Sequence, residues 1–143
     1  MTENNSYKEY TDFIMDKTVT LLGIDSPTGY TEDAAAWVKN EFEALGFHAH
    51  ITGKGGVLIE LGGKDKEDGL FLEAHTDTLG AMVASIKSSG RLLVTPLGGM
   101  NANNAETENV RIITKFDGDY EGTFQLENAS IHVNGEYDDI KRT

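Results

Sequence analysis

The feature that most constrains the fold of this chain is a short apolar run, LFLEA at residues 70–74. A nearly continuous apolar run of this length is typical of a strand that is covered on both faces. Strands of that kind occur almost only in sheets with helices packed on both sides. The charged loop at residues 62–69 precedes the run, and a polar triplet follows it. We therefore expect an α/β fold in which residues 70–74 form a central strand.

The residues before this run carry helix and strand patterns. Apolar residues over 7–22 recur at spacings of three, four and seven, which predicts one face of a helix. A second helix is predicted over residues 31–46, with Thr31 as its cap and acidic residues in its first turn. Strands are predicted at residues 47–51 and 57–61. Helix, helix, strand, strand, strand is the opening order of a layered α/β domain.

The pattern changes after Gly80. Short β-like runs follow, separated by Gly, Asn and Asp turns and without a helical period among them. These runs lie at residues 81–87, 91–96, 110–116, 120–126 and 129–133. We therefore predict the N-terminal part of an α/β catalytic domain at residues 1–80. A small all-β inserted domain, incomplete at its C-terminus, is predicted at residues 81–143.

Composition narrows the classes of partner. The chain carries 12 Lys plus Arg against 24 Asp plus Glu, a formal net charge of −12. Such a surface repels nucleic-acid phosphates and anionic lipid, so we expect no nucleic acid and no membrane among its partners. It attracts divalent cations, and without cysteine their ligands must come from His, Asp and Glu. No signal peptide or membrane-spanning run is visible, and we expect a cytoplasmic protein.

The triplet His75-Thr76-Asp77 directly follows the predicted central strand, at the edge where open α/β sheets place their ligand sites. Residues i and i+2 of an extended segment point to the same side, so the Asp77 carboxylate can approach the His75 ring. Carboxylates placed in this way fix the tautomer of metal-bound imidazoles. The triplet alone is equally compatible with a strand-end turn in which Asp77 accepts backbone hydrogen bonds.

Residues 70–82, together with the turn DSPTG at residues 25–29, resemble the family of glutamyl and deblocking metallo-aminopeptidases, which assemble into tetrahedral dodecamers. The resemblance continues into the β domain that these enzymes insert after the triplet. It is carried there by Ile86 and by residues 90–92, 97–99 and 109–112. The order of these motifs is more specific than any one of them.

The resemblance implies that His75 binds one of two divalent metal ions, zinc or cobalt, and that Asp77 is a catalytic residue that orients His75. Family members are much longer, and their other ligands and general base follow the inserted domain. We therefore expect the N-terminal half of a metal-dependent aminopeptidase that removes N-terminal residues from peptides. Alone it should be inactive and bind at most one ion weakly. Its expected partners are peptide substrates, a missing C-terminal half, or further copies in a homo-oligomer.

Other candidate ligands have simpler interpretations. His48 and His50 share a strand face and could chelate a metal, or they could simply face water. His132 is interpreted as a strand residue facing water. The acids after the triplet are interpreted as solvated charges: Asp117, Asp119, Glu127, Glu136, Asp138 and Asp139.

Two alternative hypotheses stay open. In one, the chain is a non-catalytic, β-rich fragment that binds a peptide or a partner subunit through the region after Gly80. In the other, it is a truncation product whose unpaired sheet edges favour self-association.

Overall fold

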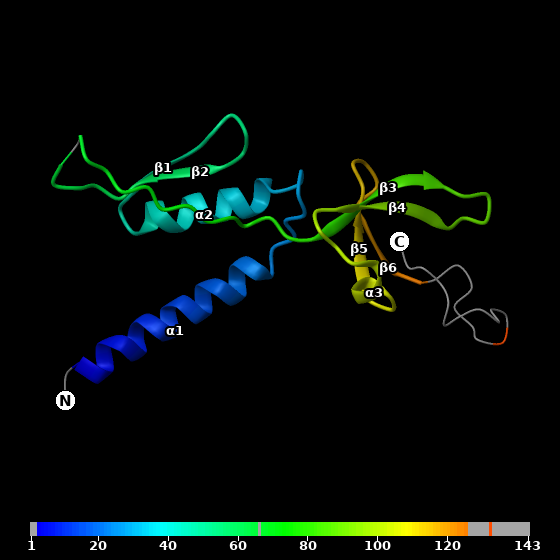
Figure 1. The fold of residues 1–143 in the computed structure, drawn as a ribbon, viewed down its shortest axis with the longest axis horizontal. Coiled ribbons are helices and arrows are strands. Elements are labelled where there is room, and N and C mark those ends of the chain that lie inside the picture. Colours follow the sequence, from blue (N-terminus) through cyan, green and yellow to red (C-terminus); the bar gives the residue numbers. More distant parts are fainter. Residues whose placement is uncertain (1–2, 66, 126–131, 133–143) are drawn as a thin grey trace. The chain divides into compact units, whose positions relative to one another are not determined.

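The computed structural model describes residues 3–65, 67–125 and 132 (Figure 1). The chain divides into two compact units, Met1–Gly98 and Gly99–Thr143. The first unit contains helices α1 (Glu3–Leu22) and α2 (Glu32–Ala44) and strands β1 (His48–Ile51), β2 (Val57–Glu60), β3 (Gly80–Ile86) and β4 (Leu92–Leu97). The second contains α3 (Ala102–Ala105), β5 (Asn109–Ile113) and β6 (Asp119–Thr123). Helices and strands are mixed, as expected for an α/β chain. None of the described helices is long and apolar enough to cross a membrane.

Both predicted helices are present. At the end of α2, Gly46 adopts a φ of 89°, the left-handed conformation in which glycine commonly ends helices. The start of α2 differs from the prediction in one detail. The Thr31 carbonyl accepts the first helical hydrogen bond from the Ala35 amide at 2.9 Å, but its hydroxyl caps no described amide. With ψ at 5°, Thr31 lacks the extended conformation that N-caps typically adopt.

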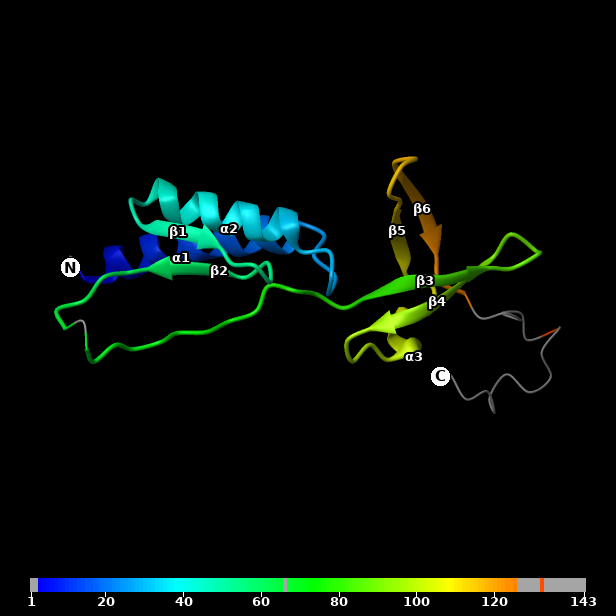
Figure 2. The same cartoon turned by 90° about the horizontal axis from the view of Figure 1, so that it is seen from above.

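Helix α2 runs along the hairpin formed by β1 and β2 (Figures 1 and 2). The two strands are antiparallel, with Ala49 opposite Ile59. The buried apolar side chains of the described residues are Ala34 and Ala35 on the helix and Ala49 on β1. Their small size lets the helix backbone lie close to the strand, which makes this contact the centre of a small core.

Two further antiparallel hairpins account for most of the β-like runs predicted after Gly80. Strands β3 and β4 pair from Gly80 opposite Leu97 to Ile86 opposite Leu92, with an irregularity between Val83 and Ser85 that is typical of a β-bulge. Strands β5 and β6 pair in the second unit. There β5 ends at Ile113 rather than at the predicted residue 116, because the next residues form the hairpin turn.

The second unit also differs from the sequence prediction. The short helix α3 was not expected; the Asn101 side chain caps it by accepting a hydrogen bond from the Asn103 amide at 3.0 Å. The predicted strand at 129–133 lies outside the described residues except for His132, which is exposed and in a turn.

The predicted central strand at residues 70–74 is wrong: the described residues between β2 and Thr78 form no strand. Leu70, Phe71 and Leu72 are instead 87%, 72% and 72% exposed. A strand requires partners for its amides and carbonyls, and no described strand pairs with this segment to provide them. The layered catalytic domain and the domain limits of 1–80 and 81–143 stay predictions.

Candidate functional site

The His75-Thr76-Asp77 triplet ends where the chain meets the turn at residues 25–29. The Thr78 amide donates a hydrogen bond to the Ser26 carbonyl at 2.7 Å, and Pro27 forms a parallel bridge with Thr78. Ser26 itself is only 1% exposed. The two segments that carry the family resemblance are therefore neighbours in space.

Gly80 makes this close approach sterically feasible. A Cβ atom at this position would lie 2.7 Å from Cβ of Pro27, well inside the normal separation of two carbon atoms. The contacting atom belongs to a rigid proline ring, so it cannot move away by a change of rotamer. A glycine is therefore required wherever the two segments are this close.

The Asp77 carboxylate lies beside the His75 ring, as the spacing predicts. The His75 Nδ1 atom is 3.0 Å from Asp77 Oδ1 and 3.2 Å from the Asp77 carbonyl oxygen. Both partners are oxygen acceptors, so Nδ1 carries the proton and donates it. In the neutral ring the lone pair then resides on Nε2. The His75 side chain is 85% exposed, which leaves this nitrogen in an open position.

The second oxygen of Asp77 is held by Thr28. The Thr28 hydroxyl donates a hydrogen bond to Asp77 Oδ2 at 2.7 Å. This bond is the main reason that the pKa of Asp77 lies below its ordinary value; desolvation opposes it, and the His75 ring assists it. Asp77 is thus an ionised acceptor between a hydroxyl and an imidazole. Thr28 was expected only as a turn residue, because nothing in its local sequence indicates this partner.

His75 and Asp77 together provide one candidate metal ligand rather than a complete metal site. Nε2 of His75 has the lone pair and the exposure that a ligand requires. Both carboxylate oxygens of Asp77 are already hydrogen-bonded, which suits an orienting role. Across the described ranges, no group of three or more His, Asp or Glu side chains is placed to hold a metal ion.

Among the described residues, other predicted candidates lie on β1 and at the β5–β6 turn. The rings of His48 and His50 lie 6.1 Å apart on the exposed side of β1, with Glu60 opposite His48. No further His, Asp or Glu among the described residues joins them in a group of three that could hold a metal ion. Asp117 and Asp119 are exposed at the β5–β6 turn, whereas Glu127, Glu136, Asp138 and Asp139 lie outside the described residues.

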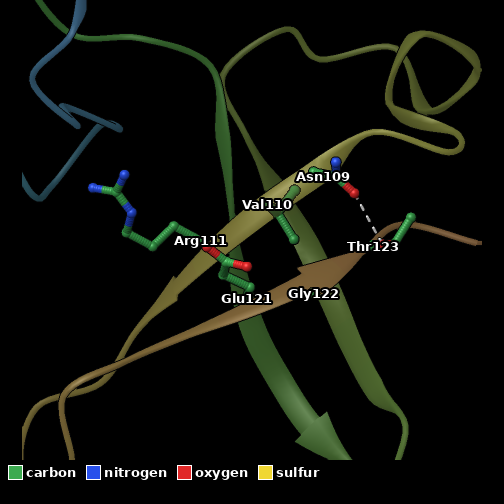
Figure 3. A pocket seen from close by; sticks show the side chains of 6 residues that line it. All are labelled: Asn109, Val110, Arg111, Glu121, Gly122 and Thr123. Atoms are coloured by element: carbon green, nitrogen blue, oxygen red, sulfur yellow. Dashed lines mark hydrogen bonds between the residues drawn. The ribbon is translucent and has the colours of Figure 1, made fainter.

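A hollow of about 420 Å³ lies on the β5–β6 hairpin (Figure 3). It is lined by Asn109, Val110, Arg111, Glu121, Gly122 and Thr123. The Thr123 hydroxyl donates to the Asn109 side-chain oxygen at 3.2 Å, and Arg111 lies opposite Glu121 in the strand register. Its lining contains neither histidine nor a nucleophile with a base beside it. The hollow therefore has polar groups for binding but no evident catalytic machinery.

Comparison with known proteins relates this geometry to a family. Residues 55–143, which include the triplet, match the model of the M42 glutamyl aminopeptidases. The chain belongs to the M42 family. The predicted resemblance is therefore confirmed, and the match extends through the hairpins that follow the triplet.

Two curated relatives of this M42 chain are aminopeptidases by name. The putative aminopeptidase YhfE of Bacillus subtilis (strain 168) is 36% identical over 113 residues, which are 79% of this chain and 33% of that protein. The glutamyl aminopeptidase of Lactococcus lactis subsp. cremoris (strain MG1363) is 32% identical over 89 residues, 62% of this chain and 25% of that protein. The chain thus spans about a quarter to a third of the length of the curated relatives it matches.

Proposed function

We propose that this chain forms the N-terminal portion of a metal-dependent aminopeptidase that removes N-terminal residues from peptides. The family match over residues 55–143 carries the proposal. The arrangement of His75 and Asp77 supports it, because a carboxylate bonded to Nδ1 is the usual partner of a metal-binding imidazole.

In this proposal His75 contributes Nε2 as a ligand to one of two divalent ions, zinc or cobalt. Asp77 keeps the proton on Nδ1 and so keeps the lone pair on Nε2, where it can bind the metal. Asp77 also fixes the plane of the His75 ring, so Nε2 is already oriented when a metal ion binds. When bound, such a metal pair supplies an activated water and a polarised peptide carbonyl.

The chain alone should be inactive. A single imidazole cannot hold two ions, because catalytic zinc sites normally use about three protein ligands for each ion. The remaining ligands and the general base would come from a C-terminal half that follows the inserted domain. The dodecameric assembly, the peptide substrates and the cytoplasmic location belong to the same proposal.

A second candidate is a non-catalytic fragment that binds a peptide or partner subunit through its β-rich part. The polar hollow on β5–β6 favours it, since Arg111 and Glu121 offer a charge of each sign on an exposed hairpin. Under this alternative, the Glu121→Lys substitution would weaken partner binding. Under the aminopeptidase proposal, it would leave metal binding unchanged.

A zinc titration of the 143-residue chain by calorimetry tests the first proposal. We expect at most one weak binding event, which is lost in the His75→Gln variant and kept in the His48→Gln variant. We also expect no metal-dependent hydrolysis of aminoacyl anilides by the chain. Tight binding of two ions that survives His75→Gln would refute the proposed role of His75, and hydrolysis by the chain alone would refute the half-site.

A further inference from the structure

Two linked hydrogen bonds join the triplet to a residue outside it, Thr28. They run from the Thr28 hydroxyl to Asp77 Oδ2, and from Asp77 Oδ1 to Nδ1 of His75, with distances of 2.7 and 3.0 Å. Thr28 comes from a segment far from the triplet, because it lies 49 positions before Asp77 in the sequence. Thr28 is therefore brought to the site by the fold rather than by local spacing.

The backbone on both sides of Thr28 is hydrogen-bonded. Its neighbour Pro27 bridges Thr78, and the Ser26 carbonyl accepts the Thr78 amide. These contacts place the turn directly beside Thr78, the residue that follows the triplet. The Tyr30 amide closes the turn by donating to the Pro27 carbonyl at 2.8 Å. Thr28 thus lies between two fixed points when its hydroxyl reaches Asp77.

We propose that Thr28 is a positioning residue whose hydroxyl fixes the Asp77 carboxylate and, through it, the tautomer and orientation of the His75 ring. The importance of this positioning role for catalysis rests on the proposed aminopeptidase function. The hydrogen bonds themselves do not depend on that function. No metal ligand role is assigned to Thr28, because its hydroxyl donates to the carboxylate.

The physical need for Thr28 follows from the exposure of its partners. The Asp77 side chain is 39% exposed, and the terminal torsion of a carboxylate is broad and only weakly restrained. A bond to each oxygen fixes the carboxylate plane, whereas a bond to one oxygen leaves it free to turn. His75 is 85% exposed and has little packing of its own, so its ring follows Asp77. A neutral imidazole in water otherwise favours the proton on Nε2, which would remove the lone pair from the metal-binding side.

Nitrogen-15 NMR of the His75 ring in the 143-residue chain measures the ratio of its two tautomers directly. His75 is one of four histidines, and the His75→Gln variant assigns its signals. Spectra are recorded at alkaline pH, so that the two neutral tautomers are compared. We expect the Nδ1–H tautomer to dominate in the wild type. In Thr28→Val, which keeps the shape and removes the donor, the ratio of Nδ1–H to Nε2–H should fall by about 3- to 10-fold, the size expected for the loss of one hydrogen bond.

Two further variants distinguish the effect of losing the Thr28 hydroxyl from the effect of disturbing the fold. Thr28→Ser keeps the donor and should keep the wild-type tautomer. Thr31→Val makes the same chemical change three positions on, where the hydroxyl caps no described amide, and should have no effect. Slow exchange of the Thr78 amide reports whether the turn is still docked in each variant.

The outcomes are distinct. A wild-type tautomer ratio in a docked Thr28→Val chain would overturn the proposal. So would loss of the Nδ1–H tautomer in Thr28→Ser, which remains decisive if Thr28→Val fails to fold. Failure of the aminopeptidase proposal would appear differently, as absent peptidase activity in a completed enzyme while the tautomer pattern of all these variants stays as expected.

Discussion

Replacing Gly80 with alanine should disrupt the contact that holds the site together. The new Cβ would lie 2.7 Å from Cβ of Pro27, whereas carbon atoms in contact prefer about 3.5 to 4.0 Å. The two segments must therefore move apart by roughly 1 Å. The hydrogen bond between the Thr78 amide and the Ser26 carbonyl is 2.7 Å long, and a shift of this size would take it beyond bonding distance.

The expected cost is that of an overpacked contact, about 1 to 3 kcal/mol of the free energy of unfolding or of local undocking. Amide exchange of Thr78 should accelerate by roughly 10- to 100-fold in Gly80→Ala, because each 1.4 kcal/mol corresponds to about a factor of ten. Gly53→Ala is the matched control, since a Cβ there meets no atom within 4 Å. Unchanged Thr78 exchange in Gly80→Ala would refute the inference that this close approach docks the triplet on the turn.

Further predictions concern charge at the same site and between the helices. Asp77→Asn should weaken metal binding by His75 about 10- to 100-fold in a completed enzyme, which a zinc titration measures. Because the pKa of Asp77 is lowered in the folded chain, its ionised form stabilises the fold above the ordinary value of 3.8. That contribution should disappear as the pH falls through the lowered value, so urea midpoints of wild type and Thr28→Val should converge in acid. Lys17 pairs with Glu41 at 2.7 Å, which raises the pKa of Lys17. The stabilisation relative to Lys17→Met should be present below the ordinary value of 10.5 and lost at higher pH, as thermal melts would show.

The parts of the fold that the sequence predicted well are those that depend on near neighbours. The periods of the two helices and the alternation of β1 are set by residues within a few turns or positions of one another. The turn glycines that end α2 and separate the hairpin strands act just as locally. The start of α2 was less predictable, because whether the Thr31 hydroxyl caps the helix depends on a single backbone angle.

The predictions that failed or were missed depend on distant partners. Residues 70–74 have the composition of a covered strand, but a strand exists only where another segment pairs with it, and composition cannot identify that segment. Thr28 was missed for the same reason, because its partner lies 49 positions away. The pairing of His75 with Asp77 was predictable since it spans only two positions. The remaining metal ligands could not be assigned, because the described residues do not contain a group that completes the site.

The most direct test of the account is a chimeric enzyme in which this chain replaces the matched region of the glutamyl aminopeptidase of Lactococcus lactis. Hydrolysis of glutamyl anilide is measured with added zinc or cobalt, for the chimera and for its His75→Ala and His48→Ala variants. We expect an active chimera that loses activity with His75→Ala and keeps it with His48→Ala. Full activity in the His75→Ala chimera would contradict the claim that this chain supplies a metal ligand to an aminopeptidase.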